Sequence, residues 1–492
     1  MLVMALDVGT SSARALCFDV AGNAVPGAEA HVSYEPTVTP DGGSELDADT
    51  LLEAVATAVD GCLAGCGGRI TDLQAVSSSI FWHSLMALDS DGAPLIPIMT
   101  WADTRSARAA ALLRRTLDEQ AVHARTGAPL HSTFFPAKLS WLRQSRGEIF
   151  ERARTWCGFA EYLHARLTGS ARASVSMASG TGLLDQSGGQ WDPELLDTCQ
   201  IRAGQLPPID DAPARGLTPR FASRWPALAH VPWYPAHGDG ACSNLGSDCS
   251  GPDRVALNVG TSSAMRMVSS GEFGRNATTP WGLWRYRVDG RRSLVGGATS
   301  EGGNVLAWCR RVLALAASDE DLERAVALIP PDGHGLTALP FLAGERSVGW
   351  RGDARAALIG LSLATTAAGI LRALMEALAY RLALVYERLA PLAAPGHAVI
   401  ASGGTLAHSR SLASIVADAL GVPIGLLSVP EASARGAALL ALEALGAPAP
   451  PPLALGETLV PDPGRHEVYR VARERQQRLY DNIVGPRLSL RE

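Results

Sequence analysis

The chain has 492 residues and a formal net charge of −6, with 47% hydrophobic and 19% charged residues. This composition is typical of a globular chain with two or three domains and argues against intrinsic disorder. The negative net charge argues against a partner held by bulk positive charge, so we expect neither a nucleic acid nor a membrane as partner.

The numbers and spacing of the lysines, cysteines and histidines argue against several kinds of binding site. Lys138 is the only lysine, so a glycine-rich P-loop that ends in Lys-Ser or Lys-Thr cannot occur. The eight cysteines form no Cys-x-x-Cys pair, and the eleven histidines show no metal-site spacing. Scattered cysteines are typical of reduced thiols, so we expect a cytoplasmic protein. Residues 1–6 are apolar but too short for a signal peptide or a membrane span.

The hexapeptide VGTSSA occurs twice, at residues 8–13 and 259–264, about half a chain apart. Each copy lies between two apolar stretches, which predicts a strand, a small-residue turn and a second strand. Glycine allows close backbone approach, and the N–H and hydroxyl groups of such a turn can bind phosphate oxygens. Either copy alone could be an ordinary hairpin turn. The repetition predicts equivalent phosphate-binding loops on two related domains that face a shared cleft.

The residue before the turn differs between the copies, being Asp7 in the first and Asn258 in the second. A carboxylate beside a phosphate loop repels the anion unless a cation lies between them. Asp7 is therefore a candidate Mg²⁺ ligand, directly or through water, with a hydrogen-bonded turn aspartate as the alternative. Arg14, just beyond the first turn, can either reach phosphate or lie in solvent.

Apolar and amphipathic stretches alternate in both halves and predict an α/β fold. In the first half we predict strands at residues 2–6, 15–18, 73–79 and 85–88, and helices at residues 51–63, 105–120 and 150–167. Proline-rich residues 207–235 predict an irregular connection. In the second half we predict strands at residues 254–259, 265–268 and 399–402, and helices at residues 305–312, 366–389, 409–420 and 431–445. A last helix at residues 468–483 follows a proline run and should pack back on one domain.

Asp239 lies between two glycines, before a run of small residues that can begin a helix. A carboxylate at such a position can accept the proton of a substrate hydroxyl as that oxygen attacks phosphorus. A helix N-cap is the alternative. Because the segment shortly precedes the second VGTSSA turn, the base and that phosphate loop should meet at one point between the domains.

Two tryptophan-containing segments predict a polyol pocket. The first holds Trp82 and His83, and the second holds Trp101, Asp103 and Arg105. Aromatic rings stack on the C–H faces of a polyol, while polar side chains bond to its hydroxyl groups. Core filling is the alternative for the tryptophans, and capping of the following helix is the alternative for the two charged residues.

Two glycine-rich positions before predicted helices could receive a nucleotide. Gly403 and Gly404 follow a predicted strand, and Gly303 precedes the helix predicted at residues 305–312. Such positions allow flat approach of a base or a ribose, and a simple strand–helix turn is the alternative. Residues 333–338 loosely match a dinucleotide fingerprint but do not follow a strand, so we reject that interpretation.

Taken in order, these segments resemble the FGGY carbohydrate kinases. The matching strings are DVGTSS at residue 7, WADTR at residue 101, GDG at residue 238, NVGTS at residue 258 and SGG at residue 402. FPAKLSWL at residue 135 and LPFLAGER at residue 339 also look like that family. The similarity runs from residue 2 to about residue 446 and, as a set, is highly specific.

The resemblance implies two actin-like ATPase domains of the ribonuclease H type, with ATP and a sugar in the cleft between them. Residues 1–250 would hold the sugar site, the first phosphate loop and the catalytic Asp239. Residues 251–446 would hold the second loop and the adenosine site, and residues 447–492 a proline-rich connection and a helix that packs back. Asp239 becomes the general base, and Asp7 and Asp239 become the candidate Mg²⁺ ligands.

The resemblance also implies which residues contact the nucleotide and which contact the sugar. Those predicted for the phosphates of ATP are Gly9, Thr10, Ser11, Arg14, Gly260, Thr261 and Ser262. Those predicted for adenosine are Gly303, Gly403, Gly404 and His408. His83 matches the substrate-contacting histidine of the Met-His motif in pentulose and gluconate kinases, where this chain has Trp82 instead of methionine.

These observations predict an ATP-dependent kinase of a small sugar, sugar acid or polyol. Gluconate, converted to 6-phosphogluconate, is the first choice because TWAD at residue 100 and GGNVL at residue 302 look most like gluconate kinases. Arg105 or His83 would then face its carboxylate. Xylulose, ribulose and glycerol are alternative substrates, and a nucleotide-gated binding protein is the alternative of another class. A homodimer is one option for its assembly.

Overall fold

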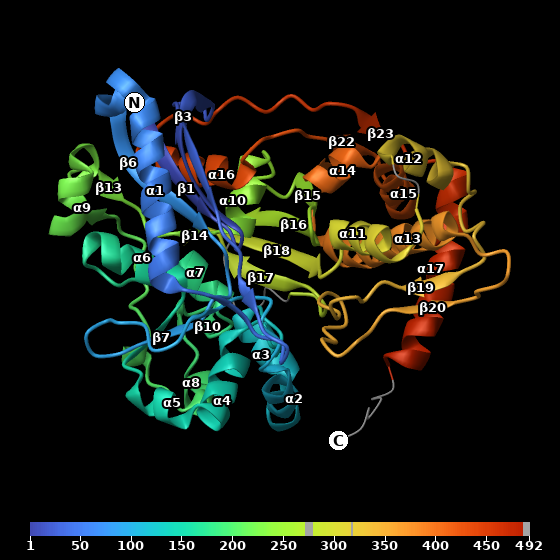
Figure 1. Cartoon of the computed structure of the whole chain (residues 1–492), viewed down its shortest axis with the longest axis horizontal. Coiled ribbons are helices and arrows are strands. Elements are labelled where there is room, and N and C mark those ends of the chain that lie inside the picture. The colour runs from blue at the N-terminus through green and yellow to red at the C-terminus, as the bar shows by residue number, and fades with distance from the viewer. Residues whose placement is uncertain (271–278, 316–317, 486–492) are drawn as a thin grey trace.

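The computed structural model describes residues 1–270, 279–315 and 318–485, and it folds the chain into two α/β halves that lie side by side (Figure 1). The first half runs from blue to green on the left of Figure 1, and the second runs from yellow to red on the right. Each half is built around a seven-stranded sheet. This arrangement confirms the α/β fold predicted from the sequence.

The first sheet has the strand order β12-β13-β6-β1-β2-β3, with β14 also paired to β6. β1 (Leu2–Val8) is antiparallel to β2 (Ser12–Phe18) and parallel to β6 (Leu73–Ile80), and β2 is antiparallel to β3 (Ala24–Ser33). Helix α1 (Ala48–Cys66) packs on β2 and β3. Buried side chains on both faces of β1 explain its nearly continuous apolar sequence.

The second sheet repeats this pattern, in the order β17-β18-β16-β15-β21-β22-β23. β15 (Arg254–Val259) is antiparallel to β16 (Ser263–Ser270) and parallel to β21 (Ala398–Ser402), and β16 is antiparallel to β18 (Arg292–Thr299). The path β18-β16-β15-β21 therefore matches β3-β2-β1-β6 strand for strand. Helix α13 (Ala367–Leu389) packs on β16 and β18.

The remaining elements are short or lie around these sheets. The other strands are β4 (Thr37–Val38), β5 (Ser44–Leu46), β7 (Met86–Leu88), β8 (Ile98–Met99), β9 (Thr155–Cys157), β10 (Leu184–Asp185), β11 (Gln190–Trp191), β12 (Ala214–Arg215), β13 (Pro232–Trp233), β14 (His237–Gly238), β17 (Trp284–Arg287), β19 (Thr337–Leu339), β20 (Ala357–Ile359), β22 (Ile424–Leu426) and β23 (Thr458–Leu459). The other helices are α2 (Ala107–Thr116), α3 (Glu119–Thr126), α4 (Phe135–Ser145), α5 (Gly147–Arg152), α6 (Phe159–Thr168), α7 (Val175–Gly180), α8 (Pro193–Cys199), α9 (Pro219–Arg224), α10 (Asp239–Gly246), α11 (Gly303–Val312), α12 (Asp319–Ala327), α14 (Gly404–His408), α15 (Arg410–Leu420), α16 (Ala432–Ala444) and α17 (Pro463–Ile483).

The two halves meet where α10 packs against α16, and α16 also covers β1 and β6 of the first sheet. The helices cross at two glycines. A Cβ on Gly246 would lie 1.8 Å from the carbonyl oxygen of Ala432, and one on Gly436 would lie 1.9 Å from that of Cys242. Only glycine allows this backbone-to-backbone approach, so the crossing fixes how the two sheets sit relative to each other.

Two helices predicted from the sequence are interrupted in the structure. The helix predicted at residues 105–120 is split into α2 and α3, because Asp118 is extended and accepts the N–H groups of Gln120 and Ala121 as an N-cap. The helix predicted at residues 150–167 is wrong in its middle. There β9 pairs with β7 and buries Trp156 completely, before extended Gly158 begins α6.

One helical stretch, Ala48–Asp72, is long and apolar enough to cross a membrane by length and composition alone. Its apolar side chains Leu51, Leu52 and Val55 are no more than 2% exposed, because α1 packs on the first sheet. The stretch therefore serves as a core helix of this half.

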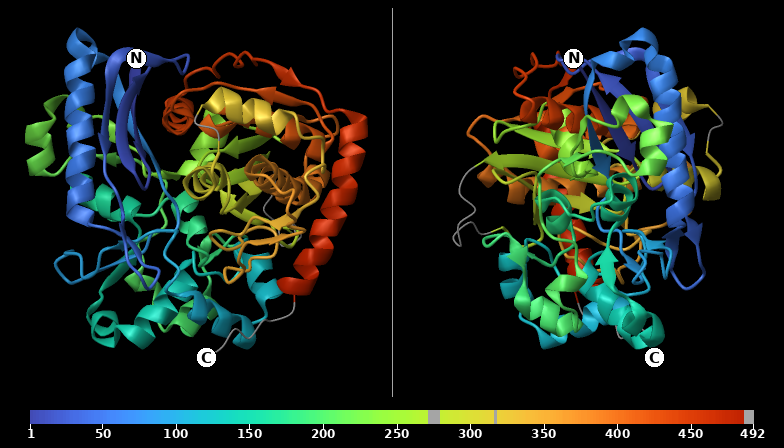
Figure 2. Two further views of the ribbon diagram at one scale, coloured as in Figure 1. Left: turned by 45° about the vertical axis from the view of Figure 1, so that its right-hand side comes forward. Right: turned by 90° about the vertical axis from the view of Figure 1, so that its left-hand side faces the viewer.

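The C-terminal helix packs back on the second half, against α13, α15 and β19. It begins at Pro463, five residues before the predicted start, because Asp462 accepts the N–H of Arg465 as an N-cap. Figure 2 shows α17 in red along the outer edge of this half.

Candidate active site

Both copies of VGTSSA form the predicted hairpin turns, the first between β1 and β2 and the second between β15 and β16. The N–H of Gly9 donates to the carbonyl of Ser12, and that of Gly260 donates to the carbonyl of Ser262, both over 2.9 Å. Neither glycine has a positive φ. The hydroxyl-bearing residues Ser11 and Thr261 at the turns are exposed, so both turns present the groups that phosphate binding requires.

The second turn is held by the starts of two helices. The carbonyl of Gly260 accepts the N–H of Gly303 over 2.7 Å and the hydroxyl of Thr405 over 3.0 Å. Gly303 begins α11, and Thr405 lies in the first turn of α14. These bonds place three predicted nucleotide segments next to one another.

Gly403 is the position in this region that requires glycine. Its φ is 107°, and a Cβ there would lie 2.5 Å from the carbonyl oxygen and 3.0 Å from the nitrogen of Val259. The glycine therefore lets the start of α14 lie directly against the strand that leads into the second turn.

We expect Gly403→Ala to lower the free energy of unfolding by about 2 kcal/mol or more, because the new methyl group meets backbone atoms in a conformation that disfavours L-residues. The matched control is Gly404→Ala, whose Cβ would have its nearest neighbour at 3.9 Å. Urea unfolding of both variants tests the expectation. Equal losses in the two variants would contradict it.

Asp7 and Asp239 lie at the same end of one sheet, Asp7 on β1 and Asp239 directly after β14, with β6 between these two strands. Asp7 pairs in register with Ser79 on β6, and Ser79 pairs with His237, two residues before Asp239. Burial raises the pKa of Asp7 to about 6, and the negative charge of Asp239 contributes to that rise. Burial also raises the pKa of Asp239, whereas the nearby guanidinium of Arg266 opposes the rise. A carboxylate whose pKa is raised by burial and by a like charge favours either protonation or a bound cation.

A cavity of about 310 Å³ lies between the two halves, beside Asp239. Five residues predicted for the site line it, namely Trp82, His83, Trp101, Asp239 and Ser262. The structure thus brings the predicted base, the predicted polyol-binding aromatics and the second turn to one place. Lining residues come from both halves of the chain, as expected for a site in a shared cleft.

His83 is held in the cavity wall in one protonation state. Its φ is 66°, and its Nδ1 lies 2.6 Å from the carbonyl oxygen of Gly180. Because a carbonyl only accepts hydrogen bonds, Nδ1 carries the proton. Burial and the positive charge of Arg346 lower the pKa of His83 well below its ordinary value, so the ring is neutral. Its Nε2 is therefore an acceptor for a ligand hydroxyl.

Trp82 forms the wall between His83 and Asp239. Its indole N–H donates to the carbonyl of Ser176 over 3.1 Å. A Cβ on Gly238 would lie 1.7 Å from the indole ring, so the glycine before Asp239 makes room for it. Where the family motif has methionine, this chain has a larger ring that packs against the residue preceding the candidate base.

Asp103 and Arg105 do not line the cavity. The guanidinium of Arg105 donates to both carboxylate oxygens of Asp103, which is fully buried, and to Glu45 over 2.6 Å. It also lies over the ring of Trp141, 4.8 Å from the centroid. The charges of Asp103 and Arg105, which the sequence analysis assigned to substrate binding, are thus paired within the protein. Arg105 does not point at a ligand carboxylate.

Two other arginines line the cavity, and the sequence assigned a role to neither. Arg266 lies on β16, four residues after Ser262 at the end of the second turn, and Arg346 ends the LPFLAGER segment. Arg346 also lies over the ring of Trp101, 5.6 Å from the centroid. An arginine between two buried methionines in a strand is the signal that would have identified Arg266, because such a charge needs a partner.

Tyr286 and Trp284 are further cavity residues that the sequence did not single out. Their rings stack on each other with centroids 4.3 Å apart, and Tyr286 meets Trp82 edge to face at 4.9 Å. Both come from β17, at the edge of the second sheet. They extend the aromatic wall across the boundary between the halves.

Of the predicted adenosine contacts, Gly303, Gly404 and His408 line a second cavity of about 320 Å³ in the second half, whereas Gly403 does not. The Nδ1 of His408 lies 2.6 Å from the carbonyl oxygen of Gly404, so it carries a proton, and the side chain is exposed. A neighbouring cavity of about 610 Å³ is lined by Thr261, Gly303 and Thr405, among others. Shared residues thus connect the adenosine cavity to the second turn.

Arg14 joins the two halves rather than lying in solvent. Its guanidinium is 2.5 Å from Glu431, at the start of α16, and 4.0 Å from the carboxylate of Asp7. Glu431 has a positive φ of 53°. Arg14 therefore lies next to Asp7, but its shorter ion pair is with Glu431 of the other half.

Lys138, the only lysine, lies fully buried behind the cavity. Its ammonium group donates to the carbonyls of His83 over 2.6 Å, Thr100 over 2.8 Å and Met99 over 3.3 Å. Burial lowers its pKa to about 7. Since Thr100 precedes Trp101, this one side chain ties together the two loops that carry the predicted polyol-binding residues.

The model of the N-terminal domain of the FGGY family of carbohydrate kinases matches residues 2–246, and that of the C-terminal domain matches residues 255–445. The chain belongs to the FGGY family of carbohydrate kinases. FGGY kinases are ATP-dependent phosphotransferases, so this protein transfers phosphate from ATP to a sugar. Membership in this kinase family excludes the alternative hypothesis of a nucleotide-gated binding protein.

Curated relatives of this FGGY kinase include enzymes for different substrates. A gluconokinase of Bacillus subtilis is 28% identical over 468 residues, covering 90% of this chain and 88% of the relative. A glycerol kinase of Trichlorobacter lovleyi is 31% identical over 463 residues, covering 90% of each chain. Sequence identity therefore supports the family without selecting one sugar.

Solved structures of FGGY kinases share the whole fold. The gluconate kinase of Lactobacillus acidophilus has a TM-score of 0.89 and 26% identity, covering 99% of this chain and 98% of that one. A xylulose kinase of the same organism has a TM-score of 0.90 and 26% identity, covering 99% of both chains. The two-domain actin-like fold of the ribonuclease H type is thereby confirmed. The domain limits, a Mg²⁺ requirement, a cytoplasmic location and a homodimer stay predictions.

Proposed function

We propose that this FGGY kinase phosphorylates a sugar acid, with gluconate, converted to 6-phosphogluconate, as the first choice. The observation that carries the proposal is the pair Arg266 and Arg346 in the cavity between the halves. Within the described residues neither has a carboxylate within 4.0 Å, and the Nε of each has no hydrogen-bond partner. The charge of Asp239 acts on both guanidinium groups, and that of Glu301 acts on Arg346, but neither carboxylate forms an ion pair with them. A neutral polyol would therefore leave both guanidinium groups without a direct anionic partner.

Two guanidinium groups suit two anionic groups. Arginine binds carboxylates and phosphoryl groups with matching fork geometry, so one arginine receives the sugar carboxylate and the other the transferred phosphoryl group. This assignment replaces the one made from sequence, in which Arg105 or His83 met the carboxylate. His83, being neutral, instead accepts a hydroxyl of the sugar.

ATP extends from this cavity across the second turn to the adenosine cavity. The serine hydroxyl of Ser262 lines the first cavity, whereas Thr261 and Gly303 line the neighbouring one. The first turn belongs to the other half. It reaches the same cavity because Asp7, which precedes it, lies at the same end of the sheet as Asp239. In this arrangement the two turns bind the phosphates, and Gly404 and His408 contact adenosine.

Asp239 accepts the proton of the attacking hydroxyl. Burial makes this carboxylate more basic, while the charge of Arg266 favours its ionised form. Asp7 and Asp239 fit a divalent cation, because hard carboxylate oxygens are the ligands that Mg²⁺ prefers and their mutual repulsion disappears on binding it. Mg²⁺, when bound, screens the charge of the phosphates. Trp82 and Trp101 hold the sugar and exclude water from the reacting oxygen.

The rate constant kcat/KM should fall as the pH decreases through about 6, whereas an ordinary carboxylate would give a limb near 4. The pKa of Asp7 is raised to about 6 and that of Asp239 is raised as well, so both carboxylates gain protons at a higher pH than ordinary ones, which removes the cation ligand and the base. A pH profile at saturating ATP measures the limb. Raising Mg²⁺ should move it to lower pH, and a limb near 4 that ignores Mg²⁺ would contradict these roles.

A substrate panel in a coupled ADP-release assay tests the sugar. We expect gluconate to give the highest kcat/KM among gluconate, xylulose, ribulose and glycerol. A ketopentose that exceeds gluconate would overturn the sugar-acid proposal and favour pentulose phosphorylation, which the likeness to a xylulose kinase structure supports.

Arg346→Met should raise the KM for gluconate by about 10- to 100-fold, because the carboxylate loses a charged hydrogen-bond partner. Arg266→Met removes the other cavity arginine, and the larger KM effect identifies the arginine that meets the carboxylate. The matched control is Arg355→Met, an exposed arginine bonded only to nearby carbonyls. An unchanged gluconate KM in both cavity variants would refute the carboxylate assignment.

A further inference from the structure

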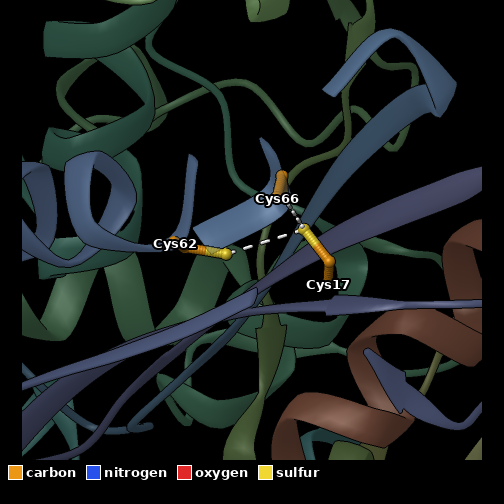
Figure 3. A group of neighbouring side chains, drawn as sticks. All are labelled: Cys17, Cys62 and Cys66. Carbon is orange, nitrogen blue, oxygen red and sulfur yellow. Dashed lines mark hydrogen bonds between the residues drawn. The ribbon is translucent and has the colours of Figure 1, made fainter. Parts of the chain in front are cut away.

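Three buried cysteines meet between β2 and α1, near the end of β2 that is farther from the first phosphate turn (Figure 3). Cys17 lies on β2, whereas Cys62 and Cys66 lie one helical turn apart on α1, which packs on that strand. The Sγ of Cys17 is 3.6 Å from that of Cys62 and 3.2 Å from that of Cys66. All three sulfur atoms lie within 4.8 Å of one another, and Figure 3 shows them pointing toward a common centre.

This cluster differs from the other group of potential metal ligands in the described residues, Asp332, His334 and Glu376. In that group Glu376 is paired with Arg372, and Asp332 with Arg475, so its negative charge is already neutralised. The three thiols have only weak contacts with one another and one bond, from Cys62 to the carbonyl of Ala28 over 3.1 Å. No ion pair competes for them.

We propose that Cys17, Cys62 and Cys66 form a binding site for one thiophilic d¹⁰ cation of the Zn²⁺, Cd²⁺ and Cu⁺ class. Thiolates are the ligands that these soft cations prefer. With a metal–sulfur bond of about 2.3 Å, three sulfurs around one cation lie about 4.0 Å apart. The sulfurs therefore reach this geometry by separating by less than about 1 Å.

The position of Cys66 allows that movement and gives a route of entry. Cys66 ends α1 and is 5% exposed, whereas Cys17 and Cys62 are fully buried. Gly67 and Gly68 follow it, both exposed and with open space around them. The end of the helix can therefore shift without a clash to admit the cation.

The thiols are protonated at neutral pH, because burial raises the pKa of Cys66 to about 12, and the hydrogen bond with Cys62, together with burial, raises the pKa of Cys17. A bound cation displaces the thiol protons directly and releases them to solvent. Arg69 lies close enough to offset part of the negative charge of the resulting complex.

The cation would join α1 to β2, the strand that follows the first phosphate turn. A ligand bound only by the folded chain stabilises it, so metal should raise the unfolding midpoint. The site is separate from the cavity of the proposed reaction, because none of the three cysteines lines it.

Titration with Cd²⁺ tests the site on the full chain, reduced with a phosphine and freed of metal by a chelator. We expect a thiolate-to-Cd²⁺ absorption band that saturates at about one cation per chain, a higher unfolding midpoint, and competition by Zn²⁺. Cys62→Ser and Cys66→Ala should each weaken binding by more than about 100-fold. Cys309→Ser, at a buried cysteine of α11 outside the cluster, should leave it unchanged.

Circular dichroism shows whether Cys62→Ser or Cys66→Ala disturbs the fold. If one of them does, the other still tests the site. Absence of the band, or an equal band in the cluster variants and in Cys309→Ser, would overturn the proposal. A count of six instead of eight titratable thiols in denatured protein before reduction would also overturn it. Two of the eight cysteines would then form a disulfide.

Discussion

Asp239→Asn should lower kcat by about 10²- to 10⁴-fold while leaving ATP affinity nearly unchanged. The amide is almost isosteric with the carboxylate and preserves the acceptance of the Gly240 N–H, which lies 2.8 Å from Oδ1. It cannot accept the proton of the attacking hydroxyl. Coupled ADP release measures kcat, and calorimetry with a non-hydrolysable ATP analogue measures binding.

Asp248→Asn is the matched control for this substitution. Asp248 lies just beyond the same helix, α10, and its φ of 58° is one that asparagine tolerates well. It contacts Arg254 and lines neither the sugar cavity nor the adenosine cavity. We expect this variant to keep normal turnover. If Asp239→Asn also keeps more than about a tenth of the wild-type kcat, Asp239 is not the base.

The sequence predicted best what is local or repeated. Each VGTSSA copy forms a turn that is closed by a hydrogen bond between residues of the repeat itself, so both turns could be predicted from six residues. Strand β15 has the predicted bounds, and α16 differs by one residue at each end. Asp239 was found because glycines on both sides leave its backbone free to begin a helix directly after a strand.

The sequence predicted poorly what depends on partners distant along the chain. Asp103 and Arg105 look like ligand contacts until Glu45, about sixty residues earlier, is seen to complete their ion pair. Arg266 looks like a strand residue until the fold sets it beside Asp239. The break between α5 and α6 likewise arises because β9 finds its partner β7 well upstream. In each case a tertiary contact outweighs the local pattern.

Lys138 shows how a residue outside the cavity wall can set the geometry of the site. Its three donors hold His83, in a left-handed conformation, next to the segment that carries Trp101. The ammonium group lies 0% exposed, so water cannot replace these bonds when the side chain is removed. Its loss removes this donor from three carbonyl groups. Those of Met99 and Thr100 still accept the N–H groups of Leu85 and Asp103, so the main loss is at the carbonyl of His83, at a cost of about 1–3 kcal/mol.

Lys138→Met should therefore lower the free energy of unfolding by about 1–3 kcal/mol, and it should raise the KM of the sugar much more than that of ATP. The second effect separates a positioning role from a purely structural one, because the adenosine cavity lies in the other half. Arg143→Met, which removes a partly exposed cation from the same helix, is the control and should change neither. Chemical denaturation and steady-state kinetics of the folded variant measure the two effects. Equal rises in both KM values would assign Lys138 to the core alone, since a general loosening of the fold does not distinguish the sugar from the nucleotide.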